Sequence, residues 1–379
     1  MYYDKYLIRR TFLMISLIGI GSKREHITLK AVDRIKEADV VIAYHPYLTH
    51  IQDLLEGKEV HSRGMGDEMQ RVELAVEKEK EGLQVAIISS GDPGIYGMAN
   101  VYFQIIDKYP DLEFEVIPGV TAATYSASAL GAPLHDLAII SLSNLLTPLD
   151  EIQRKIKHAA IADLVIAFYN PKSKSRTEPF EVACDTLLEN RNPETPVGIV
   201  TTKDGVETLT NICKLKDLRT QDIDMFTTII VGNSMTYVKK GKMITPRGYK
   251  MDAKLPELTE QFYEKFFKGD IQIGPNTDCE YFPCHNNQEN CTFCFCPFYP
   301  CADGSTGGKW IEGKNVWNCS NCNWIHKDEV VDEVLDYVKD NIHSMNDFKT
   351  KKKALLKLRR STIYKTRNLD FNRNFELDE

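Results

Sequence analysis

Short apolar runs alternate with amphipathic helical segments over residues 15–248, and this alternation constrains the fold more than any other feature. Apolar runs of four to eight residues are typical of buried strands, whereas apolar spacings of three and four are typical of helices. Residues 15–20 form such a run, and apolar residues between Ile27 and Ala38 follow at helical spacing. Strands that alternate with helices predict a largely parallel α/β sheet.

The alternation restarts after Pro133, which indicates two α/β domains in tandem, residues 14–132 and 133–250. Their predicted strands cover residues 15–20, 40–44, 85–89, 114–117, 138–142, 164–169, 197–201 and 227–231, with helices over 120–130, 149–159 and 179–188.

The two ends of the chain have a different character from the central region. Basic residues followed by an apolar run resemble a secretory signal, but no small-residue cleavage site follows. We therefore expect residues 1–13 to be a disordered leader, with Met14 as an alternative start. Residues 251–278 have the composition of a linker, and residues 346–379 that of a basic, polar, solvated tail. No other stretch is apolar enough over a sufficient length to span a membrane.

Cysteine is concentrated in one segment of the chain. Eight of the ten cysteines lie between Cys279 and Cys322, behind a region that contains only Cys184 and Cys213. Such a cluster behind an enzyme-sized region favours metal binding in a reducing, cytoplasmic setting over disulfides. Residues 279–345 are therefore predicted to form a cysteine-rich metal-binding module that ends in a helix.

The module contains two C-x-x-C pairs, which are strong metal-ligand signals. Four further cysteines are able to complete a second site, with His285 and His326 as spare donors. Zinc and an iron–sulfur cluster both suit thiolate ligands. The predicted ligands are Cys279, Cys284, Cys291, Cys294, Cys296, Cys301, Cys319 and Cys322.

The formal net charge of −7 argues against a general nucleic-acid binder. Three glycine-containing turns after predicted strands are better functional signals, because ligands bind at the carboxyl ends of parallel strands. They are Gly19-Ile20-Gly21-Ser22, the run from Ser89 to Gly97, and Pro118-Gly119-Val120-Thr121. The first is not a dinucleotide fingerprint, because Arg24 occupies the third glycine position. A nucleotide-dependent oxidoreductase is thereby disfavoured.

An ordered set of motifs gives a more specific indication. The set LIGIG, SSGDPGIYGMA, VIPGVTA, LGAPLHD, SLSNLLTP, FYNPKSKSR and ITPRGY resembles the tetrapyrrole methylases of corrin synthesis. Within that family it most resembles enzymes that methylate carbon 17 of precorrin-3B or cobalt-precorrin-3 and contract the macrocycle. The resemblance covers about residues 14–250, and it implies S-adenosylmethionine in a ligand cleft between the two α/β domains.

The resemblance also implies roles for individual residues and a homodimer. The implied cofactor-binding residues are Gly91, Asp92, Ile95, Thr121, Ala122, Tyr169 and Asn170. A tetrapyrrole carries many carboxylates, so cations and polar groups near these loops are expected to bind it: Ser22, Lys23, Lys172, Lys174 and Arg176. The first loop departs from the family pattern at Gly21–Arg24, which affects its predicted substrate contacts.

Methyl transfer from a sulfonium needs alignment more than a catalytic triad. Ring contraction needs proton transfer as well, for which His26, Asp92, His135 and Lys172 are unranked candidates. A degenerate methylase core that serves as a binding or metal-sensing scaffold is an alternative, as is methylation at another corrin position. Intact GDPGIYG and PGVTA loops favour an active enzyme.

Overall fold

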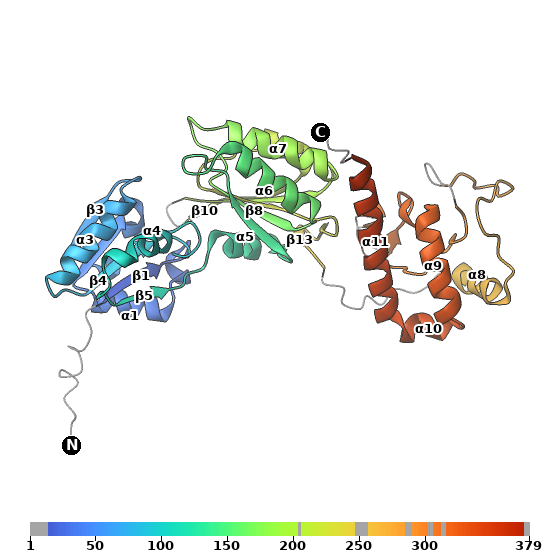
Figure 1. Cartoon of the computed structure of the whole chain (residues 1–379), viewed down its shortest axis with the longest axis horizontal. Helices are drawn as coiled ribbons and strands as arrows, with labels where there is room; N and C mark the ends of the chain where they lie inside the picture. Colours follow the sequence, from blue (N-terminus) through green and yellow to red (C-terminus); the bar gives the residue numbers. More distant parts are fainter. Residues whose placement is uncertain are drawn as a thin grey trace, which may run out of the picture. The chain divides into compact units, whose positions relative to one another are not determined.

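A computed structural model describes residues 14–203, 206–246, 257–284, 290–301, 303, 306–311 and 316–374. The leader predicted for residues 1–13 lies outside this part of the chain. The protein forms two compact units, one built mainly from residues up to Asn233 and the other mainly from Thr245 onward. The helices and strands of both units are labelled in Figure 1.

The first sheet has five strands, all parallel, in the order β3-β2-β4-β1-β5. Their bounds are β1 Ile15–Gly19, β2 Val40–Tyr44, β3 Glu59–Arg63, β4 Val85–Ser89 and β5 Phe114–Ile117. Because all five strands run the same way, the turns that follow β1, β4 and β5 leave the sheet at one edge.

Helices cover both faces of this sheet. Alternate strand residues such as Leu17 and Ile42 pack with α3 (Glu68–Lys80) and α4 (Met98–Ile105). The intervening residues pack with α1 (Leu29–Glu37) and the 3-10 helix η3 (Thr49–Leu54). Burial on both faces explains why β1, β2 and β4 are almost entirely apolar.

The second sheet is mixed, which corrects the prediction of a largely parallel arrangement. Its order is β10-β9-β11-β8-β7, with bounds β7 Leu137–Ser141, β8 Val165–Tyr169, β9 Pro196–Lys203, β10 Val206–Lys214 and β11 Thr227–Val231. Only β7 and β8 pair in parallel, whereas β10 and β11 are antiparallel to their neighbours. A connection of two residues joins β9 to β10, and so short a connection permits only an antiparallel pair.

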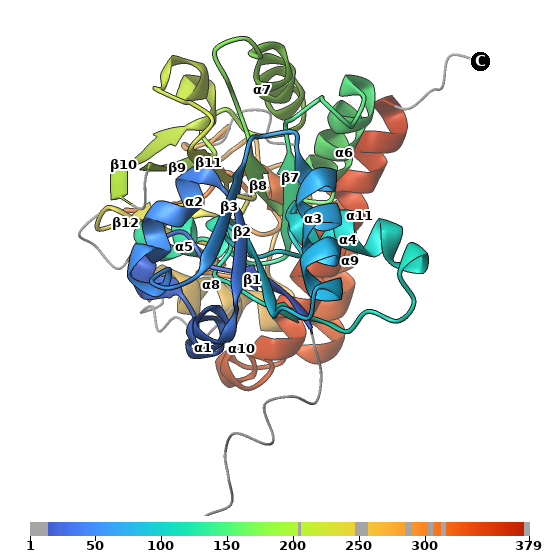
Figure 2. The same cartoon turned by 90° about the vertical axis from the view of Figure 1, so that its left-hand side faces the viewer.

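The helices of the second sheet show where the boundary between the two sheets falls. The helices α6 (Leu149–Ile161) and α7 (Glu178–Asn190) pack together on one face (Figures 1 and 2). The opposite face is covered by α5 (Ala122–Leu130). Because α5 packs on the second sheet, the chain passes from the first sheet and its helices to the second directly after β5. This point lies before the predicted boundary at residue 132.

The remaining elements of this region are short. They are η2 Arg24–His26, α2 His45–Leu48, η4 Ile106–Lys108, β6 Gly131–Ala132, η5 Leu215–Thr220, β12 Tyr237–Lys239 and β13 Lys242–Ile244, with β6 and β13 paired in parallel.

The second unit has its own aromatic core, which extends into the predicted linker. Residues 257–268 of that linker form α8 (Glu257–Lys268), whose Tyr263 and Phe266 are buried beside Phe293. These side chains recur at helical spacing and need a core to cover them, so this segment belongs to the module. The unit also contains β14 Lys309–Trp310, β15 Trp317–Asn318, η7 Trp324–His326 and α9 Asp328–Asn341.

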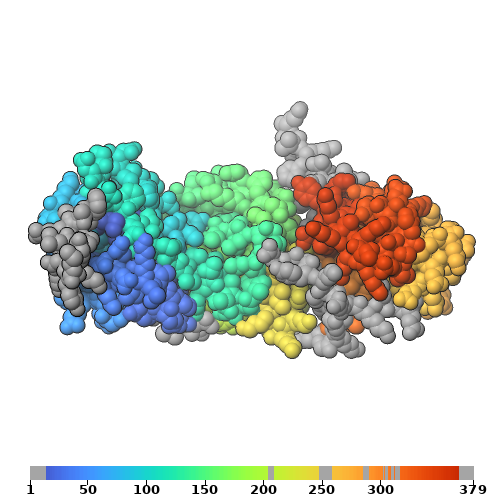
Figure 3. Space-filling view, turned by 90° about the horizontal axis from the view of Figure 1, so that it is seen from below, coloured from blue at the N-terminus to red at the C-terminus, as the bar shows by residue number. Residues whose placement is uncertain are grey.

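The predicted solvated tail is helical over most of its length. All of residues 346–374 except Lys351 lie in α10 (Met345–Thr350) and α11 (Lys352–Asn374). Leu355 is buried in the module core, and Arg359 forms a buried ion pair with Asp303 at 2.7 Å. The orange and red segments that contain these helices form a closely packed surface (Figure 3). The basic residues therefore belong to an amphipathic helix, which corrects the prediction of a polar tail.

Within the described residues, no helix combines the length and apolar character required to cross a membrane.

Candidate functional site

Two glycine turns are joined at the carboxyl edge of the first sheet. Gly21, after β1, and Gly91, after β4, exchange two backbone hydrogen bonds of 3.1 and 3.0 Å. Both have positive φ values, 68° and 61°, which glycine adopts without strain. The turns predicted as separate ligand loops therefore form one continuous backbone surface.

The third turn packs against the same surface. A Cβ added at Gly119 would overlap the Gly91 carbonyl oxygen and lie 2.9 Å from the Gly19 carbonyl oxygen. A Cβ at Gly19 would lie 2.7 Å from the Gly119 nitrogen. The glycines at these positions let three chain segments approach at backbone distance.

The carboxylate of Asp92 hydrogen-bonds to the backbone of two of these turns. Its Oδ1 accepts a hydrogen bond from Gly94 N at 2.8 Å, and its Oδ2 accepts one from Gly119 N at 3.1 Å. The partly buried side chain thus links the turn after β4 to the turn after β5. A carboxylate has about four lone-pair sites, so these two bonds leave acceptor capacity for a ligand.

Tyr96 connects the turn after β4 to the second sheet. Its hydroxyl donates to Ile139 O and accepts from Ser141 N, both at 3.1 Å. The backbone of Tyr96 has a φ of 54°, which is uncommon for a side chain of this size. Its ring lies 6.0 Å from that of Tyr169 and is about half exposed. Both partners lie in β7, so the side chain bridges the two layers.

Tyr169 makes the reciprocal connection from the end of β8. Its hydroxyl accepts from Ala123 N at 2.8 Å and hydrogen-bonds to Thr121 Oγ1 at 2.5 Å. Burial raises the pKa of this phenol, so the group remains neutral and able to donate. Thr121 is buried at the N-cap position of α5. The end of β8 is therefore fixed to the start of the helix that follows β5.

Asn170 and Arg176 organise the ends of β7 and β8. Asn170 has a φ of 50° and donates through Nδ2 to Ser141 Oγ at 3.1 Å. Arg176 donates to Leu142 O at 2.5 Å and to Asn170 O at 2.8 Å. Burial lowers the pKa of this guanidinium. The Arg176 guanidinium thus hydrogen-bonds to two backbone carbonyls, whereas the sequence predicts that it binds the substrate.

The other predicted substrate residues lie on two separate loops. Lys23 places its Nζ 5.1 Å above the ring centre of Tyr125, and Ser22 next to it is partly buried. Lys172 places its Nζ 5.4 Å above the ring of Phe180. Lys174 is exposed on the loop between β8 and α7.

The two histidines predicted for proton transfer differ in their surroundings. His26 packs against the ring of Tyr125 at 5.2 Å, and its Nδ1 is buried without a hydrogen-bond partner among the described residues. His135 Nε2 instead lies 3.4 Å from Asp136 Oδ2. The remaining predicted cofactor residues also lie at these turns, with Ile95 partly buried after β4 and Ala122 opening α5.

Sequence reasoning missed Tyr96 and Ser141 as connecting residues. Tyr96 lies inside the GDPGIYG motif, where a large side chain among glycines was the available signal. Its hydrogen bonds to β7 join residues more than forty positions apart, and strand pairing in three dimensions determines that separation.

The eight cysteines of the module, all within described residues, form no disulfide. Burial raises the pKa of the Cys296 thiol well above its usual value, and the neighbouring thiols of Cys301, Cys322 and Cys319 raise it further. Burial likewise raises the pKa of Cys294, whose thiol neighbours are Cys284, Cys279 and Cys291. Within the described residues, no three His, Cys, Asp or Glu side chains converge closely enough to hold a metal ion.

The structure is thus an α/β protein with two five-stranded sheets and with glycine turns at the carboxyl ends of strands, followed by a cysteine-rich module. The chain belongs to the tetrapyrrole (corrin/porphyrin) methylases, whose family model matches residues 14–203. A second model, described as a cysteine-rich small domain, matches residues 270–349.

Individual relatives support this assignment. A probable cobalt-factor III C(17)-methyltransferase from Methanothermobacter thermautotrophicus is 53% identical over 350 residues, covering 92% of this chain and 99% of the relative. A protein of the same description from Salmonella typhimurium is 42% identical over 240 residues, covering 62% of this chain and 99% of its own length. The crystal structure of the methyltransferase CobJ matches with a TM-score of 0.59 and 31% identity, covering 62% of this chain and all of that one.

The two relatives differ in how much of this chain they match. The Salmonella protein is matched over nearly its whole length, yet that similarity covers 62% of this chain. An alignment of 350 residues is too long for the α/β region alone, so the archaeal similarity includes much of the cysteine module.

Proposed function

We propose that this protein transfers a methyl group from S-adenosylmethionine to carbon 17 of cobalt-factor III, or of the related precorrin-3B or cobalt-precorrin-3, and contracts the macrocycle in cobalamin biosynthesis. The similarity to the archaeal C(17)-methyltransferase over 92% of the chain is the observation that carries the proposal. The intact connection of glycine turns and tyrosines is consistent with an active enzyme rather than a degenerate scaffold.

The residues at the turns fit a nucleoside-type ligand. Gly19, Gly91 and Gly119 present backbone groups without side chains, so a ligand is able to approach the main chain closely. Asp92 keeps acceptor capacity for a hydroxyl or an ammonium group. We assign cofactor binding to these turns, with Ile95, Thr121, Ala122, Tyr169 and Asn170 around the ligand.

S-adenosylmethionine supplies a methyl group on a cationic sulfur, which is already activated for transfer to an electron-rich carbon. The protein then has to align the two reactants and exclude water, and such alignment is worth several powers of ten in rate. Tyr96 and Tyr169 serve this purpose by joining the two layers on either side of the turns. Their hydroxyls are engaged with backbone groups, which gives both residues a positioning role.

The substrate carboxylates require cations at the site. We assign this role to Lys23, Lys172 and Lys174, with Ser22 as a polar neighbour. Arg176 shapes the loop that carries two of these lysines, because its guanidinium hydrogen-bonds to Leu142 O and Asn170 O.

Ring contraction requires a group that moves a proton. Of the candidates, His26 has a buried ring nitrogen without a partner among the described residues, whereas Asp92 accepts two backbone hydrogen bonds and His135 pairs with Asp136. An unpaired buried polar atom costs free energy and calls for a functional explanation. We therefore assign the proton transfer to His26.

The test uses the full chain, purified without oxygen, with cobalt-factor III and S-adenosylmethionine labelled in the methyl group. We expect one labelled methyl per turnover, at carbon 17, in a ring-contracted product. His26→Gln is expected to methylate without contracting the ring. Binding of both ligands without transfer would instead identify a scaffold, and label at another carbon would overturn the site of methylation.

For the module, we propose that the cysteines hold zinc or an iron–sulfur cluster. The donor set fits, because thiols that form no disulfide suit either metal centre and would release their protons on binding. The same thiol chemistry supports a cytoplasmic location. The family resemblance further predicts a homodimer, which sedimentation analysis of the full chain would detect.

A further inference from the structure

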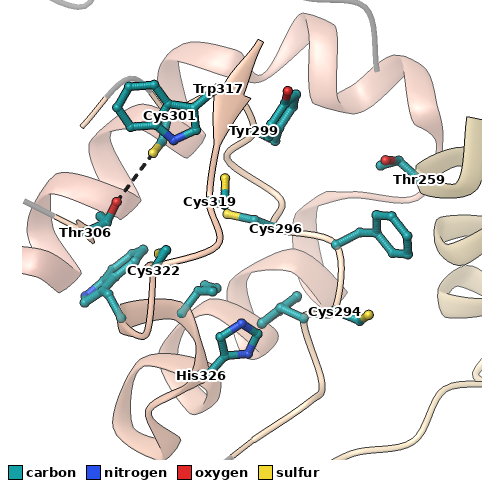
Figure 4. A pocket seen from close by; sticks show the side chains of 14 residues that line it. Thr259, Cys294, Cys296, Tyr299, Cys301, Thr306, Trp317, Cys319, Cys322 and His326 are labelled. Carbon is teal, nitrogen blue, oxygen red and sulfur yellow. Dashed lines mark hydrogen bonds between the residues drawn. The ribbon is translucent and has the colours of Figure 1, made fainter. Parts of the chain in front are cut away.

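The cysteine module contains a cavity of about 210 Å³ inside its aromatic core. Cysteines make up an unusual share of its lining, together with Tyr299, Trp317 and Trp324. Figure 4 shows the sulfurs of Cys296 and Cys319 pointing toward one another, with those of Cys301 and Cys322 around the same space.

Cys294 also borders this cavity, but its sulfur points away from the other four (Figure 4). The orientation matters because Cys294 and Cys296 are separated by a single residue, so spacing alone would place them in the same site. The two thiols are presented to different sides of the chain.

Cys294 belongs to a second group of cysteines, whose other members are Cys279, Cys284 and Cys291. Asn276 joins two of its members, since its nitrogen donates to Cys291 Sγ at 3.3 Å and its carbonyl accepts from Cys279 N at 3.3 Å. The thiols of Cys284, Cys279 and Cys291 all interact electrostatically with that of Cys294.

The two groups have a common design. Each contains one C-x-x-C turn, closed by a hydrogen bond from Cys294 N to Cys291 O at 3.0 Å or from Cys322 N to Cys319 O at 2.8 Å. They also follow one another along the chain, with the first four cysteines in one group and the last four in the other. Each group can therefore close its loop without threading through the other.

We propose that the module holds two separate metal centres, each bound by four cysteines. The outer centre is formed by Cys279, Cys284, Cys291 and Cys294, and the inner centre by Cys296, Cys301, Cys319 and Cys322. This partition rests on the metal binding proposed above and is independent of methyl transfer. It differs from a grouping by sequence spacing alone, in which the two C-x-x-C pairs share one site.

Metal binding has to draw the thiols of each group together, because they do not yet form a coordination sphere in the described residues. Four thiolates around one ion adopt tetrahedral geometry with metal–sulfur distances of about 2.3 Å. The inner group closes inside the aromatic core, whereas Cys284 and Cys294 of the outer group are exposed. We therefore expect a chelator to remove metal from the outer centre first.

The test compares Cys291→Ser, in the outer group, with Cys319→Ser, in the inner group, in the full chain purified without oxygen. Metal, iron and acid-labile sulfide are measured per chain, together with the visible spectrum. We expect about two centres in the unmodified chain and about one in each variant. Sulfide and brown colour would identify clusters, and zinc alone would identify tetrahedral zinc sites. Cys213→Ser, on β10 outside the module, is the matched control and should keep both centres.

A single centre in the unmodified chain would overturn the partition, as would loss of all metal in both single variants. Cobalt(II) titration of metal-free unmodified chain provides a check that does not depend on variants that fold. Saturation at about two equivalents supports the proposal, and saturation at one contradicts it. Calorimetry with S-adenosylmethionine on the same samples keeps the two proposals apart, because a chain can hold two metal centres and fail to bind the cofactor, or the reverse.

Discussion

Replacing Gly119 with alanine tests the glycine surface at the proposed cofactor site. The new Cβ would overlap the Gly91 carbonyl oxygen and lie 2.9 Å from the Gly19 carbonyl oxygen, where ordinary contacts begin at 3.4 Å. The atoms nearest to this Cβ are all backbone atoms, so the turns after β1 and β4 would have to move apart. Overpacking of this kind costs about 1–3 kcal/mol. If the displaced turns bind the cofactor, its affinity should fall by about 10- to 100-fold.

The measurement is calorimetric titration of S-adenosylmethionine, with thermal unfolding of the same sample. Gly64→Ala is the matched control, because its Cβ would meet only the flexible end of Asp67. We expect the control to bind as the unmodified protein does. If Gly119→Ala binds the cofactor with unchanged affinity, these turns are not the binding surface. If it unfolds at room temperature, Gly94→Ala, whose Cβ would meet only Asp92 Oδ1, takes its place and should lower affinity without unfolding.

Four other changes test the remaining contacts. Asp92→Ala removes both bonds of its carboxylate and should weaken cofactor binding by about tenfold or more, whereas Asp92→Asn should weaken it less; calorimetry decides. Tyr169→Phe should lower stability by about 1–2 kcal/mol in denaturant unfolding, because the buried Ala123 N–H loses its acceptor. Arg359→Met leaves Asp303 buried without its ion-pair partner and should destabilise the module by about 3–5 kcal/mol, an effect that fluorescence of its tryptophans would report. Removal of residues 257–379 should leave cofactor affinity unchanged, since the α/β cores contain no residue from that segment; loss of binding would refute their independence.

Several strands could be predicted from the sequence. Residues 40–44, 85–89, 114–117 and 227–231 match observed strands residue for residue. Two of these segments, residues 40–44 and 85–89, are almost entirely apolar and lie inside the first sheet, where burial on both faces dictates composition. In contrast, β3 and β10 went unpredicted, because polar residues outnumber or interrupt the apolar ones in both strands.

The helix α11 has a periodic pattern of buried residues that its composition alone does not reveal. Leu355, Arg359 and Ile363 recur at intervals of four and are all buried. An apolar stripe interrupted by one arginine looks polar when residues are merely counted, but the arginine has Asp303 as a buried partner. Asp303 lies more than fifty positions earlier, so the stripe could be identified from sequence only if a buried ion pair had been considered.

The candidate residues at the glycine turns could be selected from the sequence because their signal is local. Glycine at a turn after a strand reports a backbone requirement of that position, whatever lies nearby. The tyrosine contacts are different, because a phenol hydroxyl has no preferred partner in sequence and acquires its role from the strand it reaches. Tyr96 hydrogen-bonds to β7 and Tyr169 to α5. Both contacts form because the second α/β domain begins directly after β5 and the first two strands of its sheet are parallel. If β8 ran antiparallel to β7, Tyr169 and Ser141 would lie at opposite ends of the sheet, and Asn170 could not reach Ser141. The parallel pairing of β7 and β8 therefore brings the second layer to the glycine turns, although the rest of that sheet is mixed.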